Sequence, residues 1–183
     1  KKRKKEHYID NKKLYSVMIE YRKQLYENEQ SGFDERPEIS NYLGECFIKI
    51  AEGLAQRPNF INYTYKEDMV GDGIINCVEY CHNFDPEKSR NPFSYFTQII
   101  YYAFLRRIER EKKQSYIKHK LTEIFVSVSD LATLQDHDNV KMEDLQVYIN
   151  ENSTVVEEFE EKMKQKKSKN KAKKNLEKFM ELE

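Results

Sequence analysis

Apolar residues recur every three or four positions through the first half of the chain, a spacing that places them on one side of a helix. This pattern predicts helices over Asn11–Asn28, Ser40–Gln56 and Glu67–Cys81. Ser40 offers an N-cap oxygen to the second helix, and Pro58 stops it. The apolar stripes comprise Leu14, Val17, Met18, Tyr21 and Leu25 in the first helix, Leu43, Phe47, Ile50 and Leu54 in the second, and Met69, Val70, Ile74, Cys77, Val78 and Cys81 in the third.

Two glycines, Gly71 and Gly73, lie inside the third predicted helix. Each costs about 1 kcal/mol relative to alanine at such a position. Either another backbone passes close to this helix, or the helix is intrinsically weak. The sequence favours neither explanation over the other.

A fourth helix is predicted from Pro92 to about Gln114, roughly 35 Å long at 1.5 Å per residue. Asn91 offers the N-cap oxygen, and Pro92 suits the first turn because its missing N–H is not needed there. The helix has two stripes. Phe93, Thr97, Ile100, Phe104 and Ile108 form one that suits a core, and Tyr95, Ile99, Tyr102, Arg106, Arg110 and Lys113 form another that starts aromatic and ends basic.

The pattern is less regular beyond Tyr116. Residues Ile124–Leu131 are typical of a short strand or extended segment, whereas Glu143–Ile149 and Thr154–Met163 have helical spacing. The segment Lys162–Lys174 has eight lysines and no acidic residue, which predicts a flexible chain.

Few glycines and prolines, with abundant Lys, Glu and Leu, favour an all-α fold for the 183 residues. We expect a compact helical core over residues 1–118, followed by an extended C-terminal segment. That segment comprises a partly helical linker over 119–161 and a flexible basic tether with a terminal peptide over 162–183.

Charge is segregated along the chain although the net charge is zero. Residues 1–5 are all basic, and residues 106–120 hold seven Lys or Arg against two Glu. Four acidic residues directly precede the lysine-rich segment: Glu157, Glu158, Glu160 and Glu161. Such a protein can bind phosphates with one face and a basic protein surface with another, but solvated helix faces explain each run equally well.

Nothing in the sequence predicts catalysis, a cofactor or a metal site. Cys77 and Cys81 share a helix face, but structural zinc needs four ligands and Cys46 has no neighbouring partner, so buried thiols are the default interpretation. The four histidines lack a nucleophile arrangement, and no phosphate loop or HExxH motif occurs. The odd number of cysteines, without a signal peptide or membrane-length apolar span, predicts a cytoplasmic protein.

The aromatic density of the fourth helix is its most informative property. Seven of the eleven residues from Phe93 to Ala103 are Phe, Tyr or Ile, and arginines and lysines follow. Aromatic faces accept unstacked bases and guanidinium groups accept phosphates, so the helix suits a protein that binds opened nucleic acid. Core packing is the better explanation for Phe93, Ile100 and Phe104. For four others, core packing and base stacking are about equally good explanations: Tyr95, Phe96, Ile99 and Tyr102.

A small apolar cluster follows the lysine-rich segment, at Leu176, Phe179, Met180 and Leu182. It is either a frayed end with no partner or a short linear ligand for a groove on another protein. A flexible tether would then raise the local concentration of whatever the core binds.

Several motifs agree in order and spacing with region 2 of bacterial sigma factors, and the chain most closely resembles the late-transcription sigma factors of T-even-type bacteriophages. These motifs are IAEGLAQRPNF at Ile50–Phe60, EDMVGDGI at Glu67–Ile74, HNFDPEKSRNP at His82–Pro92, and the YFTQ…AF…RRI run that ends at Ile108. The resemblance covers Leu43 to about Lys118.

This resemblance implies two partners, the core RNA polymerase of a bacterial host and promoter DNA. The third helix would bind the clamp helices of the polymerase β′ subunit, because acidic and apolar residues suit a basic coiled coil. By position, the residues on this surface would be Asp68, Asp72, Ile74 and Val78.

The fourth helix would recognise and open a −10-like, A/T-rich promoter. Phe96 would stack on the first opened base, while Arg110 and Lys113 would hold phosphates. The remaining DNA contacts implied by the resemblance are Ile99, Tyr102, Ala103, Arg106 and Arg107, and the aromatic-basic stripe adds Tyr95 as a candidate contact.

Primary sigma factors carry two adjacent tryptophans at a position where this chain has Ile99 and Ile100. The side chains that would separate the two DNA strands are therefore smaller here. No second helix-turn-helix domain is evident after Gln114. Phage late sigma factors share both features and depend on the replication sliding clamp, which they bind through a short hydrophobic-acidic peptide. The resemblance implies this peptide at Leu176, Phe179, Met180 and Leu182, adds a phage coactivator to the expected partners, and places the protein in the host cytoplasm.

Two other functions stay open. One is a helical polymerase-binding adaptor, such as a coactivator or anti-sigma factor, which would not need an aromatic-basic helix. The other is a general single-strand binder, which would bind any oligonucleotide and lose affinity steeply with salt.

Overall fold

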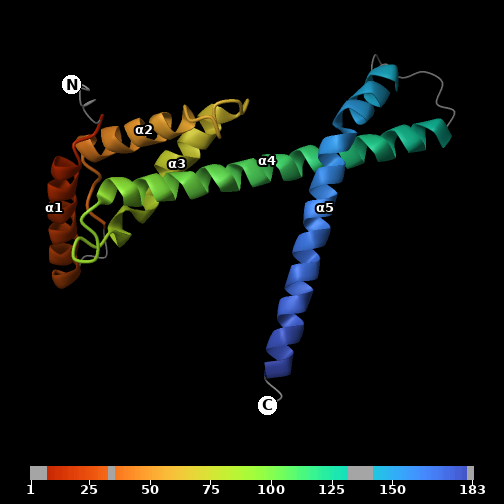
Figure 1. Ribbon diagram of the computed structural model, residues 1–183. Helices are drawn as coiled ribbons and strands as arrows, with labels where there is room; N and C mark the ends of the chain where they lie inside the picture. Colours follow the sequence, from red (N-terminus) through yellow and green to blue (C-terminus); the bar gives the residue numbers. More distant parts are fainter. Residues whose placement is uncertain (1–7, 33–35, 132–141, 181–183) are drawn as a thin grey trace, which may run out of the picture. The chain divides into compact units, whose positions relative to one another are not determined.

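A computed structural model describes residues 8–32, 36–131 and 142–180, and all regular structure in these ranges is helical (Figure 1). The elements are α1 (Asn11–Gln30), α2 (Asn41–Ala55), α3 (Lys66–Tyr80), the short 3-10 helix η1 (Cys81–Asn83), α4 (Pro92–Leu131) and α5 (Met142–Met180). The all-α prediction is confirmed for the described residues. The chain divides into two compact units, unit 1 (Lys1–Ile108) and unit 2 (Glu109–Glu183), and the division falls inside α4.

Three helices of unit 1, α1, α2 and α4, begin at side-chain caps. Ser40 accepts a hydrogen bond from the Leu43 amide at 3.4 Å, and Asn91 accepts one from the Ser94 amide at 3.1 Å, so both predicted N-caps are confirmed. Asp10, which the sequence analysis missed, accepts from the Lys12 amide at 2.9 Å. These bonds satisfy amides that have no partner inside the helix, and they fix where each helix starts.

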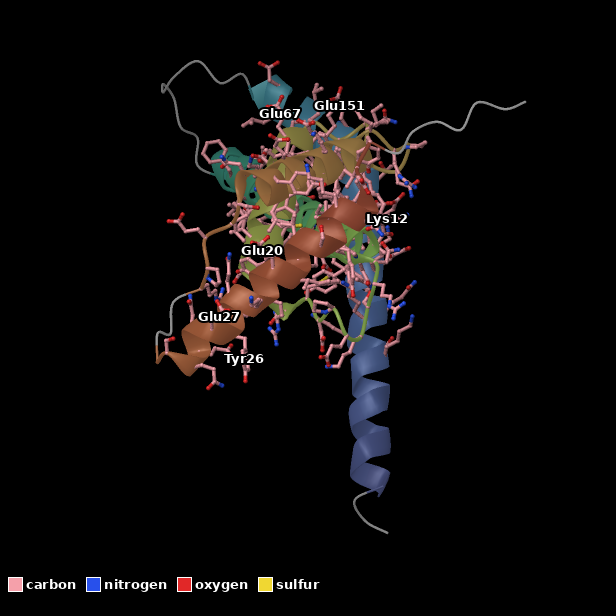
Figure 2. All side chains as sticks on the ribbon, turned by 90° about the vertical axis from the view of Figure 1, so that its left-hand side faces the viewer. Lys12, Glu20, Tyr26, Glu27, Glu67 and Glu151 are labelled. Atoms are coloured by element: carbon pink, nitrogen blue, oxygen red, sulfur yellow. The ribbon has the colours of Figure 1, made fainter. Side chains whose placement is uncertain are left out.

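The predicted apolar stripes meet in one core in unit 1. Its largest fully buried side chains are Phe47, Phe84, Phe96, Phe104, Leu14, Met18, Leu43, Ile50, Met69 and Ile100. Aromatic rings in this core pack tilted, as Phe47 and Phe96 do, or edge to face, as Phe60 and Phe104 do, because the face and edge of a ring have opposite partial charges. The outer side of α1, toward the viewer in Figure 2, carries the exposed Glu20, Tyr26 and Glu27. Unit 1 therefore has a well-packed core and a charged outer side on α1.

Gly73 lies where side chains from the first half of α4 pack closely against α3. A Cβ atom built on Gly73 would lie 2.9 Å from Ile100 Cγ2 and 3.2 Å from Phe104 Cε1, whereas one on Gly71 would meet nothing within 4 Å. Close approach therefore explains Gly73, although the approaching groups are side chains rather than a backbone. Nothing within unit 1 requires glycine at position 71.

Unit 2 pairs the second half of α4 with α5. The Tyr116 and Phe159 rings pack with centroids 5.1 Å apart, and Val126 and Val156 are buried. His119 is buried and its Nε2 lies 3.1 Å from the Ile149 carbonyl oxygen, so Nε2 carries the proton and donates.

Three expectations about the second half of the chain are wrong. Helix α4 continues past Gln114 to Leu131, so Ile124–Leu131 is helical rather than extended. The two short helices expected over Glu143–Ile149 and Thr154–Met163 are one helix, α5, which also includes the backbone of the expected flexible segment 162–174. No glycine or proline interrupts either stretch, and ion pairs one turn apart, such as Glu158–Lys162 at 3.8 Å, support the charged part of α5.

Alanine substitution at the two glycines of α3 should have opposite effects. Gly73→Ala should lower the free energy of unfolding, because overpacking costs about 1–3 kcal/mol and exceeds the gain in helix propensity. The matched control, Gly71→Ala, should raise it by up to about 1 kcal/mol, because its Cβ meets open space. Urea denaturation followed by circular dichroism would measure both changes. Equal effects at the two positions would contradict the close packing at Gly73.

Candidate functional site

The outward side of α3 combines acidic and apolar groups. Asp68, Ile75, Val78 and Glu79 are exposed and define the α3 outer face, with Ile75 63% exposed. Ile74 is only half-exposed and packs against the core. Asp68 and Val78 are therefore accessible to a partner, whereas the apolar residue that projects furthest is Ile75, not Ile74. The helical spacing from Asp68 to Ile75 and Glu79 could have indicated this.

Asp72 and Arg107 were assigned to different partners, but in unit 1 they bind each other. Arg107 Nε donates to Asp72 Oδ2 at 2.7 Å and Nη2 donates to Oδ1 at 3.1 Å. Their side chains are only 18% and 23% exposed, so this two-point ion pair is partly shielded from solvent. Neither group is available to polymerase or DNA while the pair is intact, which corrects both assignments.

Phe96 is fully buried, in contrast to its predicted role as a base-stacking ring. Its centroid lies 4.6 Å from that of Phe47 and 5.2 Å from that of Tyr95. It lies four residues before Ile100, and both belong to the core side of α4. Ala103 is buried as well. Both DNA-contact predictions are wrong for this conformation, because a buried side chain cannot meet a base.

The exposed side of α4 in unit 1 is centred on Tyr102, whose side chain is 51% exposed. Gln98 lies one turn before it, Arg106 lies one turn after it, and Leu105 is beside it, all exposed. We call these four residues the Tyr102 face. It combines an aromatic ring, an amide, an aliphatic group and a cation on about two helical turns.

Two other predicted contact residues are only half-exposed. The Tyr95 hydroxyl donates to the Tyr80 carbonyl oxygen at 3.2 Å, which anchors this side chain to the end of α3. Ile99 packs partly against the core. Tyr101, which the sequence analysis did not select, is 38% exposed and contacts the Tyr102 ring with centroids 5.8 Å apart.

A hydrogen-bonded chain links the Tyr102 face to α3. Arg106 Nη2 donates to Asn76 Oδ1 at 2.5 Å, and Asn76 Nδ2 donates to the Asp72 carbonyl oxygen at 2.7 Å. Together with the Asp72–Arg107 pair, these bonds fix the α3 outer face next to the Tyr102 face within unit 1, where α3 lies beside the first half of α4 (Figure 1). The arrangement can present an acidic-apolar surface and an aromatic-basic surface at the same time.

The other predicted contacts lie in unit 2. Arg110 and Lys113 are exposed on α4. Leu176, Phe179 and Met180 belong to α5, but their side chains lie outside the described part of the chain, as does the whole of Leu182.

The three cysteines are buried, as the sequence predicted for thiols without a metal role. Burial raises the pKa of Cys81 to about 12 and also raises the pKa of Cys77, so both remain neutral thiols at neutral pH. Among the residues that the structure describes, no group of three His, Cys, Asp or Glu side chains could hold a metal ion.

No protein-family model matches this sequence, and a comparison with curated proteins gave no match. Among the described helices, none has the length and apolar character needed to cross a membrane.

The Asp72–Arg107 pair should show measurable coupling in a double-mutant cycle. We expect Asp72→Ala, Arg107→Ala and the double variant to give a coupling energy of about 1 kcal/mol in urea denaturation, because the pair is bidentate and partly shielded. The exposed pair Lys23–Glu27, 3.7 Å apart, is the comparison pair and should show a smaller coupling energy, at most about 0.5 kcal/mol. Coupling near zero for Asp72–Arg107 would mean that the pair does not hold α3 to α4.

Proposed function

We propose that this chain is a transcription initiation factor of the sigma region 2 type, from the late class of T-even-type bacteriophages. It binds the β′ clamp helices of host core RNA polymerase, recognises and opens a −10-like A/T-rich late promoter, and is activated through a DNA sliding clamp. One observation carries this proposal: the α3 outer face and the Tyr102 face lie next to each other on unit 1, so one unit can contact polymerase and DNA together.

The α3 outer face has the chemistry of a helix-binding surface for a basic coiled coil. Asp68 and Glu79 supply negative charge around Ile75 and Val78, which supply apolar area. Interfaces combine an apolar centre with a charged rim that sets the choice of partner. Gly71 lies on the same side with open space above it, so a partner helix could approach closely at this point.

For DNA, the structure supports Tyr102 as the stacking ring instead of Phe96. An exposed ring can take an unstacked base, and Arg106 one turn away can hold a phosphate or base edge. Gln98 adds the amide geometry that pairs with adenine. These three groups provide both stacking and polar contacts from one side of one helix.

The proposed dependence on a sliding clamp is based on the residues that would separate the two DNA strands, Ile99 and Ile100. Ile100 is fully buried and Ile99 is half-buried, so neither projects far enough to prop open a duplex. Promoter opening then needs help from a second factor. The apolar and acidic residues of segment 176–183 are the part of the chain proposed to bind the clamp.

A polymerase-binding adaptor without base recognition is the second candidate. The burial of Phe96 and Ala103 and the pairing of Arg107 with Asp72 favour it, because three expected DNA contacts are occupied inside unit 1. The adaptor would use the α3 outer face and leave the Tyr102 face without a role.

Reconstituted transcription separates the two candidates. With core polymerase, loaded clamp and a −10-like A/T-rich promoter, the wild type should give start-site-specific transcripts. Tyr102→Ala with Arg106→Ala should reduce them at least tenfold, since a stacked base is worth about 1–3 kcal/mol. The control Tyr26→Ala, on the outer side of α1, should have no effect (Figure 2). Full activity of the double variant would favour the adaptor, and no specific transcripts from the wild type would refute the sigma function.

Polymerase binding should depend on the α3 outer face. Ile75→Glu should weaken binding to core polymerase at least tenfold, because it places a charge in the apolar centre of the interface. Ile19→Glu is the matched control, since Ile19 is an exposed isoleucine on α1. Affinity can be measured by fluorescence anisotropy with labelled chain. Equal affinities of the two variants would place the polymerase contact elsewhere.

A further inference from the structure

The second half of α4 has a large apolar surface that α5 does not cover. Ile117, Leu121 and Ile124 follow one another at helical spacing, and Leu121 and Ile124 are 61% and 57% exposed. We call these three residues the distal α4 face. The other side of this helix packs on α5 through His119 and other buried residues. Exposed apolar groups in a continuous patch indicate a contact with another molecule.

Positive charge lies at the N-terminal end of the distal α4 face. Lys113 lies one turn before Ile117, Lys118 lies beside it, and both are exposed. The nearest acid along the helix, Glu123, is bound to Lys120 at 3.0 Å. The surface is therefore apolar in the middle and basic at one end, which suits an acidic amphipathic segment.

The chain itself contains a segment of that chemistry. Residues 176–183 have the sequence LEKFMELE. Leu176, Phe179 and Met180 are spaced so that a helix would place them on one side, and Glu177 and Glu181 would lie on an adjacent side. We propose that this segment of one copy docks on the distal α4 face of a second copy of the chain.

The contact is between copies because α5 runs away from the distal α4 face within one chain. The Phe159 ring packs on the Tyr116 ring and Lys166 pairs with Glu109, so successive turns of α5 lie beside earlier residues of α4. Leu176 comes seventeen residues after Phe159, about 25 Å along a continuous helix. A short segment on three side chains is smaller than a standard interface, so the association is weak unless two copies exchange segments reciprocally. A docked segment is not free to bind a sliding clamp, so self-association would oppose the activation step proposed above.

Sedimentation velocity of the full chain over a range of concentrations tests the proposal. We expect a monomer–dimer equilibrium in the micromolar range, and Leu121→Glu should weaken it at least tenfold. Tyr26→Glu is the matched control, because Tyr26 is also 61% exposed but lies on α1. Circular dichroism checks that both variants keep their helix content. If Leu121→Glu loses helix content, the surface double variant Lys113→Glu with Lys118→Glu replaces it.

A charge exchange tests the identity of the docked segment. Lys113→Glu with Lys118→Glu should weaken association, and so should Glu177→Lys with Glu181→Lys in the segment. Mixing these two charge-reversed chains should restore association to within a few-fold of wild type, because each then meets the opposite charge. A labelled peptide of residues 174–183 should also bind the wild-type chain and compete with dimer formation.

Each other outcome overturns the proposal. A chain that stays monomeric and does not bind the peptide has no such contact. A dimer that survives Leu121→Glu uses another surface, and a dimer unaffected by the segment variants has a different occupant on α4. None of these assays contains polymerase, promoter or clamp. A negative result would therefore refute self-association alone, and the transcription function would be tested separately by the reconstituted transcription assay.

Discussion

The packing of α3 against the first half of α4 is the interaction on which the candidate site depends. It requires a residue without a Cβ at Gly73, because Ile100 and Phe104 occupy that space. Once the helices are this close, the Arg107 guanidinium reaches Asp72 and the Arg106 guanidinium reaches Asn76. The apolar contact sets the distance between the helices, and the polar contacts beside it fix their rotation, so both exposed faces have defined positions.

The same packing decides which aromatic residues can act at the surface. A helix that buries Phe96, Ile100 and Phe104 on one side must expose the residues about half a turn away, and these are Gln98, Tyr102 and Leu105. Aromatic residues in α4 therefore have two roles, one in the core and one outside. A function that uses the exposed set can tolerate changes there without loss of the fold, because those side chains contribute little to the core.

The two units differ in how their helices are stabilised. Unit 1 has a core built from α1 to α4, whereas unit 2 has two long helices that share a narrow apolar seam. A two-helix unit buries one side of each helix and leaves the others to solvent, which explains why α4 retains an apolar face there.

The amino-acid sequence by itself determined the all-α class, the bounds of the first three helices within a few residues, and most of the unit 1 core, because these follow from the local spacing of apolar residues. It also determined the caps at Ser40 and Asn91, because these depend on local hydrogen bonds. It also identified α4 as the helix with unusual aromatic and basic content. The sequence was misleading at Ile124–Leu131, where the apolar residues fit both the spacing of a strand and the spacing of a helix. In the structure this stretch is helical, and Val126 is buried in the unit that α4 forms with α5. Only the tertiary structure decided that Phe96 is buried while Tyr102 is exposed, that Ile75 rather than Ile74 projects outward, and that Asp72 binds Arg107. Those outcomes depend on which side of each helix faces its neighbour, and that rotation is set by contacts between residues far apart in the sequence.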